Sequence, residues 1–187
     1  MHSIPNFEAK KEERLFHILS MVNDWLKFAE AKHAILIAFN GASIYGLVNV
    51  IDMAWLNDNP FFKPYLMFVI IVLAITVVVG VLSFIPQLKF IHFNSSSSEN
   101  QKSSIYFGHL KDKSAISIIQ GIYETSEEKF SSLELDIAHQ IQQNSTIASN
   151  KFDLFTVAAW LTIIAYVNIL AFILGVILWA IRNNQVK

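Results

Sequence analysis

The chain has 187 residues, of which 53% are hydrophobic and 16% charged, and its formal net charge is -1. Soluble domains carry about 25% charged residues, so this shortfall, concentrated in three stretches, indicates membrane spans. The near-zero net charge argues against a general nucleic-acid-binding protein, and the absence of cysteine excludes disulfides and thiolate metal sites.

Residues 1–33 predict a cytosolic amphipathic helix. Within residues 7–30, apolar side chains recur at helical spacing: Leu15, Ile18, Leu19, Val22, Trp25, Leu26 and Ala29. That face either packs on the rest of the cytosolic domain or lies on the membrane surface. The interspersed charges leave no apolar run long enough for a signal peptide, so we expect the first span to serve as the insertion signal.

Three segments are long and apolar enough to cross a bilayer, which needs about 20 mostly apolar helical residues. They are residues 34–56, 65–85 and 154–181, and the last two contain no charge. Pro64 precedes the second segment at a helix-start position, and Pro86 follows it. The first segment is more polar, and its alternative is a re-entrant or interfacial helix.

The distribution of basic residues predicts the orientation. Residues 1–33 hold five Lys or Arg and residues 86–153 hold six, against one in the link 57–64 and two in the tail 182–187. Because cytoplasmic segments carry the excess of Lys and Arg, we expect the N-terminus and residues 86–153 to be cytosolic. The tail then emerges on the far side.

The cytosolic region between the last two spans is predicted to be mostly helical. Residues 94–104 are serine-rich and read as a loop, and a helix is expected over Ser114–Tyr123. Thr125 and Glu128 have the spacing of a capping box, and from there one helix of about 55 residues could run to Ile181. The predicted fold is therefore all-α: three transmembrane helices, an N-terminal amphipathic helix, and a helical cytosolic domain continuous with the last span.

Four polar residues of the first span are pore candidates: Asn40, Ser43, Asn49 and Asp52. Each step of three residues drifts by about 60° around a helix, so the first two share one side and the last two share nearly the opposite side. The alternative for Asn40 and Ser43 is interhelical hydrogen bonding beside small residues. The alternative for Asp52 is an interfacial carboxylate near the outer end of the span.

Catalytic and metal-binding patterns are not apparent. The six histidines form no HExxH pair, and there is no Walker loop, GxGxxG or GxSxG sequence. Asp136 and His139 share a helix face that could hold a metal between subunits, but a solvated pair is the preferred interpretation. We therefore expect no enzymatic activity and no cofactor.

Several segments resemble the Pycsar effector family of bacterial membrane proteins, in the same order over about residues 20–181. They are Asn23–Lys32, Ala38–Ala42, Leu82–Pro86, the FGH element of Ile105–Leu110, Leu135–Ile141 and Asn150–Phe152. His33 departs from the small residue expected after the lysine, without upsetting the pattern.

The resemblance implies an oligomeric membrane effector of nucleotide-signalled antiphage defence. Such a protein is expected to be an ion channel or pore in the bacterial inner membrane, gated at its cytosolic face by a nucleotide or single-stranded oligonucleotide. Pycsar effectors often carry a cyclic-nucleotide-binding domain, which we do not expect here, so either this module senses the signal itself or another protein controls it. In Hailong-type systems a similar small channel is held closed by DNA oligomers that a nucleotidyltransferase makes.

Three helices cannot comfortably enclose a channel, so the expected partners include further copies of the chain, the lipid bilayer, and a cyclase or nucleotidyltransferase encoded nearby. The alternative function is a non-conducting membrane anchor or assembly protein that recruits a partner through its cytosolic helix.

Two clusters are candidates for the ligand site, because a phosphate ligand needs local positive charge and a base needs a stacking surface. The first comprises Lys89, His92, Tyr106, Phe107, His109, Lys111 and Lys113. The competing cluster comprises Lys10, Lys11 and Arg14. In the alternative interpretation these cations only satisfy the positive-inside rule, and Phe107 belongs to the core.

Overall fold

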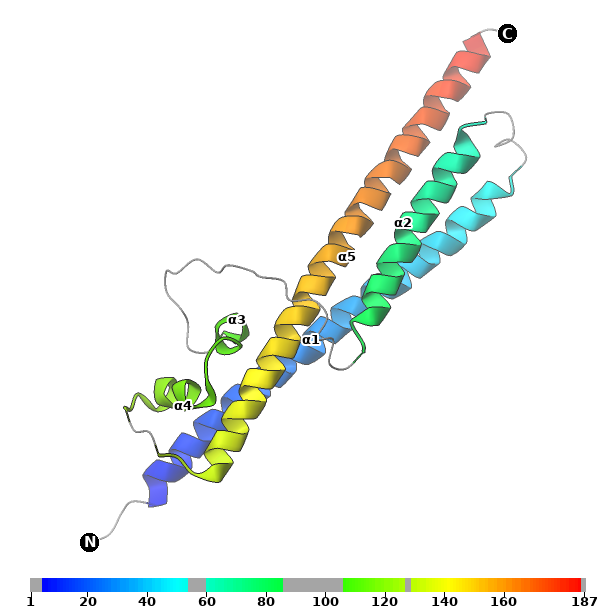
Figure 1. Cartoon of the computed structure of the whole chain (residues 1–187). Coiled ribbons are helices and arrows are strands. Elements are labelled where there is room, and N and C mark those ends of the chain that lie inside the picture. The colour runs from blue at the N-terminus through cyan, green and yellow to red at the C-terminus, as the bar shows by residue number, and fades with distance from the viewer. Residues whose placement is uncertain (1–4, 54–59, 86–105, 127–128, 186–187) are drawn as a thin grey trace. The chain divides into compact units, whose positions relative to one another are not determined.

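A computed structural model describes residues 5–53, 60–85, 106–126 and 129–185. Over these residues it is all-α, with no strand (Figure 1). The helices are α1 (Pro5–Ile51), α2 (Phe62–Leu82), α3 (Phe107–Leu110), α4 (Ala115–Tyr123) and α5 (Ser132–Gln185). Three of them, α1, α2 and α5, are long and apolar enough to cross a membrane, which confirms the predicted fold class.

The chain divides into two compact units. The head unit comprises Met1–Ala31 and Gln87–Asp153, and the membrane unit comprises Lys32–Pro86 and Leu154–Lys187. Both α1, with 47 residues, and α5, with 54 residues, contribute to both units without interruption. For α1 this continuity has a simple cause, since no proline or glycine occurs between Pro5 and Gly41.

Helix α4 begins and ends with recognisable caps. The Oγ of Ser114 accepts a hydrogen bond from the backbone N–H of Ser117 at 3.2 Å, which satisfies one of the free donors of the first turn. At the other end Glu124 adopts a left-handed conformation with a φ of 52° and closes the helix. The helix predicted over Ser114–Tyr123 is thus confirmed.

Helix α5 begins seven residues later than the sequence suggested. The N–H of Ser131 donates to Oε2 of Glu134 at 2.7 Å, and the N–H of Glu134 donates to Oγ of Ser131 at 3.2 Å. This reciprocal pair is a capping box, and α5 starts at Ser132. The start predicted at Thr125 is wrong, because that residue follows the end of α4 in non-helical backbone; Glu128 lies outside the described residues.

The head unit has its own apolar core. The amphipathic face of α1 packs against α3, α4 and the first turns of α5. Of the two predicted alternatives for that face, this is packing on the other helices of its domain rather than lying on the membrane surface. The buried members are Leu15, Ile18, Val22, Leu110, Ala115, Ile118, Ile119, Tyr123, Ile137, Ala138 and Ile141.

Two polar contacts also join α1 to α5 within the head unit. The Nδ2 of Asn144 donates to Oδ1 of Asn23 at 2.8 Å. The ammonium of Lys151 forms an ion pair with Glu30 at 2.7 Å.

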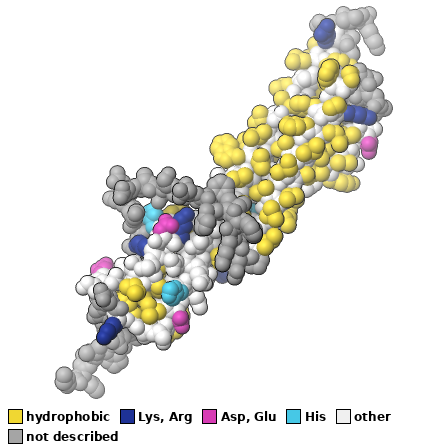
Figure 2. Space-filling model, viewed as in Figure 1, with side chains coloured by type: hydrophobic (Ala, Val, Ile, Leu, Met, Phe, Trp, Pro, Cys, Tyr) yellow, Lys and Arg dark blue, Asp and Glu magenta, His cyan; other side chains and the backbone are white. Residues whose placement is uncertain are grey.

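The membrane unit has the opposite polarity. Figure 2 shows its surface covered with hydrophobic side chains, and exposed examples come from each of its helices, such as Ile35, Phe68 and Leu170. Its interior is tightly packed at one point, where a Cβ on Gly80 of α2 would lie 2.8 Å from Cγ1 of Ile37 on α1. Such a surface is suited to lipid or to further apolar helices rather than to water.

Candidate pore and ligand sites

One predicted pore pair lies in the interior of the membrane unit. Asn40 is fully buried, and its Nδ2 donates to Oγ1 of Thr162 on α5 at 2.9 Å. That hydroxyl donates in turn to the backbone oxygen of Ala158 at 2.9 Å. Ser43 of α1 is hydrogen-bonded to the hydroxyl of Tyr166 on α5. Both residues therefore make interhelical hydrogen bonds within one subunit, which was the alternative to their pore role.

The other predicted pore pair lies on the exposed side of α1, as the helical spacing indicated. Asn49 and Asp52 are both exposed, and the Nδ2 of Asn49 donates to the backbone oxygen of Tyr45 on its own helix, at 2.9 Å. Gly41 and Gly46 share this exposed surface, and a Cβ on either would meet nothing within 4 Å. We call this surface, defined by Gly41, Tyr45, Gly46, Asn49 and Asp52, the open face of α1.

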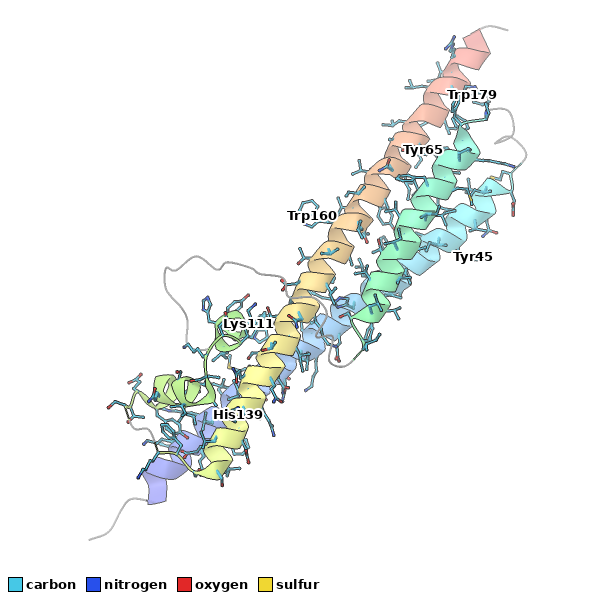
Figure 3. The ribbon with its side chains drawn as sticks, in the orientation of Figure 1. Tyr45, Tyr65, Lys111, His139, Trp160 and Trp179 are labelled. Atoms are coloured by element: carbon cyan, nitrogen blue, oxygen red, sulfur yellow. The ribbon has the colours of Figure 1, made fainter. Side chains whose placement is uncertain are left out.

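A third polar connection links α2 to α5. The hydroxyl of Tyr65 donates to the backbone oxygen of Asn168 at 2.8 Å and approaches its Oδ1 at 3.1 Å. The ring of Tyr65, a residue labelled in Figure 3, also stacks on Phe172, with 5.8 Å between centroids. The three helices of this unit are thus joined by hydrogen bonds as well as by apolar packing.

In the first predicted ligand cluster, α3 packs into the head unit. Phe107 is 5% exposed and stacks on Phe152 with 5.2 Å between ring centroids, so it belongs to the core. Tyr106 is half-exposed and lies against Gly108, where a Cβ would be 2.5 Å from Cε1 of the ring. His109 meets the same ring edge-on at 5.4 Å. Among the described rings of this cluster, Tyr106 alone is exposed.

The two described lysines of this cluster differ in their surroundings. Lys111, which is labelled in Figure 3, donates from Nζ to Oγ of Ser149 on α5 at 3.0 Å. The Nζ of Lys113 instead lies 4.0 Å from the point where a Cβ on Gly121 would stand. Two further members of the cluster lie outside the described residues: Lys89 and His92.

The competing cluster is divided by the fold. Lys11 points its ammonium at the ring of Tyr123, 5.2 Å from the centroid. Burial first, and then the nearby carboxylates of Glu134 and Glu12, raise the pKa of the Tyr123 hydroxyl. Burial alone would raise the pKa of Glu134, but hydrogen bonds from Ser131 and the charge of Lys11 lower it overall. Lys11 therefore stabilises the packing of α1 against α4 and α5.

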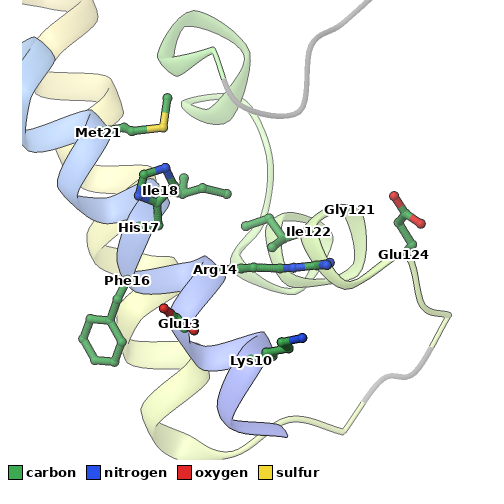
Figure 4. A pocket seen from close by; sticks show the side chains of 10 residues that line it. All are labelled: Lys10, Glu13, Arg14, Phe16, His17, Ile18, Met21, Gly121, Ile122 and Glu124. Atoms are coloured by element: carbon green, nitrogen blue, oxygen red, sulfur yellow. The ribbon is translucent and has the colours of Figure 1, made fainter. Parts of the chain in front are cut away.

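Lys10 and Arg14 lie on a different side of α1, where they line a pocket with a volume of about 860 Å³ between α1 and α4. They are four residues apart and His17 follows three residues later, so the three side chains share one helix face. Figure 4 shows the side chains of Lys10 and Arg14 extending toward α4. The apolar lining consists of Phe16, Ile18, Met21 and Ile122.

Two acidic residues also line this pocket. Glu13 remains close to α1, whereas Glu124 stands at the end of α4 (Figure 4). The pocket is therefore a mixed site, with an apolar wall, clustered cations and two carboxylates at its edges.

Comparison with known proteins gives the family. A family model described as the Pycsar effector protein domain, PycTM, matches residues 14–181. The chain belongs to the Pycsar effector family. Members are transmembrane effectors of antiphage defence and not known enzymes. Their membrane character agrees with the three long apolar helices of this structure.

A curated relative supports the same assignment. The Pycsar effector protein PtPycTM of Propioniciclava tarda is 28% identical over 142 residues, which cover 72% of this chain and 65% of the relative. The chain thus spans just under two thirds of that relative's length. No solved structure matches this chain.

Sequence reasoning missed several residues that the structure places at the sites of this Pycsar effector. Thr162 and Tyr166 are four residues apart, so they share one face of α5. That face carries the hydrogen bonds to Asn40 and Ser43 of α1. The spacing was visible in the sequence, and so were Asn40 and Ser43, but nothing in the sequence paired them across helices. His17 was passed over because only the tertiary fold brings α4 beside it.

The two residues considered for a metal site, Asp136 and His139, belong to α5. Within the described ranges, no group of three or more His, Asp or Glu side chains is arranged to hold a metal ion. Asp136 and His139 are both exposed on α5.

Proposed function

We propose that the protein is a homo-oligomeric channel of the bacterial inner membrane that depolarises an infected cell. Its head unit is cytosolic and is the gate, controlled by a nucleotide or a single-stranded oligonucleotide. Membership of the Pycsar effector family supports the role in defence, and the excess of basic residues in the head unit supports its cytosolic placement. A cyclase or nucleotidyltransferase encoded nearby is the expected source of the ligand.

The observation that carries this proposal is the open face of α1. Polar side chains in a membrane helix normally face other helices or a water-filled cavity, because lipid offers them no hydrogen-bond partner. Asn49 is exposed within one subunit, so in the bilayer it needs either a neighbouring subunit or pore water beside it. Gly41 and Gly46 leave room for a second helix to approach closely.

The pair that bonds to α5 has a different role in this proposal. Asn40 and Ser43 already bond to α5 within the subunit, so they hold the helices together. Asn49 and Asp52 then line the pore or the contact between subunits, and Asp52 contributes negative charge at one mouth.

Ion flux from liposomes tests the proposal. The purified protein is reconstituted with potassium inside, and a voltage-sensitive dye reports flux with and without added cyclic nucleotides or short single-stranded DNA. We expect flux in one of these conditions, and we expect Asn49→Leu to change it. Val48→Leu is the matched control, because Val48 is exposed, apolar and adjacent.

Absence of flux under every condition, from protein shown to be folded and inserted, would favour the alternative function. In that case the chain is a non-conducting anchor that recruits a partner. If Asn49→Leu and Val48→Leu both conduct as the parent does, the open face of α1 does not line the pore.

A further inference from the structure

We infer that the pocket between α1 and α4 of the head unit is the binding site for the phosphate-bearing ligand. The phosphate lies between Lys10 and Arg14, and the base lies on the apolar wall formed by Ile18 and Ile122. The identity of the ligand as a nucleotide rests on the proposed function. The location of the site rests on the pocket itself.

The size and lining of the pocket suit an amphiphilic small molecule. Its volume of about 860 Å³ lies within the range of about 300–1,000 Å³ that is usual for ligand pockets. An apolar wall beside two basic side chains, Lys10 and Arg14, matches a flat base joined to a charged phosphate, and the two carboxylates lie at the edges. Gly121, which lines the pocket, widens it because no side chain projects there.

The cations at this pocket are available to a ligand. Among the described residues, neither Lys10 nor Arg14 forms an ion pair or a hydrogen bond through its side chain. Arg14 supplies a planar fork of donors that suits a phosphate oxygen pair, and Lys10 supplies a point charge beside it. The ammonium of Lys113 ends near Gly121 and adds a third positive charge next to the lining.

The other candidate surface is already occupied by contacts within the chain. Lys111 donates to Ser149, and the ring of Phe107 is buried against Phe152. Binding a nucleotide there would require these contacts to break. The two predicted clusters are thus partly reconciled, because Lys113 from one approaches the pocket lined by Lys10 and Arg14 from the other.

The acidic edge gives the inference a second, opposite electrostatic test. Glu124 lies at the pocket with its backbone in the left-handed region. Its carboxylate repels a phosphate, so Glu124→Gln should strengthen binding by about twofold, whereas loss of a basic residue should weaken it.

The experiment measures binding to the full-length protein in a zwitterionic detergent. The probe is a short, fluorescently labelled single-stranded DNA, and unlabelled cyclic nucleotides and inorganic phosphate serve as competitors. We expect the double variant Lys10→Gln/Arg14→Gln to weaken binding at least about tenfold. Its salt slope, log K against log salt, should become shallower by about 1.4 for two lost phosphate contacts.

Lys27→Gln is the matched control, since Lys27 lies on the same helix, is exposed, and pairs with Asp24 at 3.2 Å. It removes one charge without touching the pocket, so affinity should stay within about twofold. Circular dichroism confirms that each variant is folded.

Three results overturn the inference. One is unchanged affinity in the double variant, with loss of binding in Lys111→Gln instead. Another is a parent protein that binds none of the soluble probes. The third is binding that appears only with vesicles of anionic lipid, which would make a lipid headgroup the phosphate source. Because these readouts do not involve ion flux, failure here leaves the channel proposal standing, and absence of flux leaves the binding result interpretable.

Discussion

The hydrogen bond between Asn40 and Thr162 offers a quantitative test of how the membrane unit is held together. Thr162→Val removes the acceptor of the Asn40 amide while retaining the shape of the side chain. Asn40 is fully buried, and its Oδ1 has no hydrogen-bond partner among the described residues. In the valine variant the Asn40 amide therefore loses its hydrogen bond to Thr162 and remains buried.

The expected magnitudes follow from this arrangement. Leaving a buried polar group unsatisfied costs about 1–3 kcal/mol, so Thr162→Val should destabilise the unit by that amount. Asn40→Leu should cost less, under about 1.5 kcal/mol, because the Thr162 hydroxyl keeps its bond to Ala158 and the buried amide disappears. The double variant should resemble Asn40→Leu alone. The coupling energy then equals in size the cost of Thr162→Val alone, about 1–3 kcal/mol. Hydrogen bonds between membrane helices average about 0.6 kcal/mol and reach about 1.7 kcal/mol, so a value at the lower end is expected.

The assay is unfolding of the four proteins in mixed micelles with increasing SDS, followed by far-UV circular dichroism. This double-mutant cycle isolates the interaction between Asn40 and Thr162 from the other effects of each substitution. The control is a second cycle that combines Tyr65→Phe with Asn40→Leu, because those two residues have different hydrogen-bond partners. The control pair should be additive to within about 0.5 kcal/mol. If Asn40→Leu and Thr162→Val are also additive, the bond contributes nothing, and Asn40 returns to being a pore candidate.

Three further predictions concern orientation, pH and packing. A topology reporter fused after Lys187 should behave as periplasmic and one inserted near Ser97 as cytosolic, and a cytosolic C-terminus would contradict the three-span arrangement. The pKa of Glu134 is lowered on folding, so its stabilising contribution is complete above the ordinary value of about 4.5 and is lost as the pH falls through the folded pKa. The urea midpoint of the parent should therefore fall over that acidic window more than the midpoint of Glu134→Gln, and parallel pH profiles would refute the reasoning. Gly80→Ala should destabilise the membrane unit by about 1–3 kcal/mol in SDS unfolding, because its Cβ would lie 2.8 Å from Cγ1 of Ile37. Adding Ile37→Ala should restore part of the lost stability, and no recovery would point to another cause.

The membrane helices were the most predictable part of the fold. The run from Tyr65 to Ile85 has no charge and a proline on either side, so hydropathy alone identifies it. The continuity of α1 was harder to foresee, since its buried face is apolar around Leu15 but includes the amide of Asn40 further along. A single hydrophobic pattern does not describe a helix that lies in two environments.

The start of α5 shows why local signals were insufficient. Thr125 and Ser131 are each followed three residues later by a glutamate, so both satisfy the spacing of a capping box. Tertiary contacts distinguish them, because Phe130 packs edge-on against Tyr123 at 6.3 Å and extends the connection before the helix begins. The pocket was less predictable still, since it depends on α4 packing beside a part of α1 that is about 100 residues away in sequence.

The opposite polarity of the two units has a practical consequence for any measurement of stability. The head unit buries Leu15 and Ile141 away from water, so urea, which solvates apolar and peptide groups, should unfold it. The membrane unit exposes Ile35 and Leu170 and is held by hydrogen bonds and close packing, so it should resist urea and respond to a denaturing detergent. We therefore expect two unfolding transitions with different chemical sensitivities, although α1 and α5 contribute to both units. A single melting temperature would not describe the chain, and each variant needs the denaturant that matches its unit.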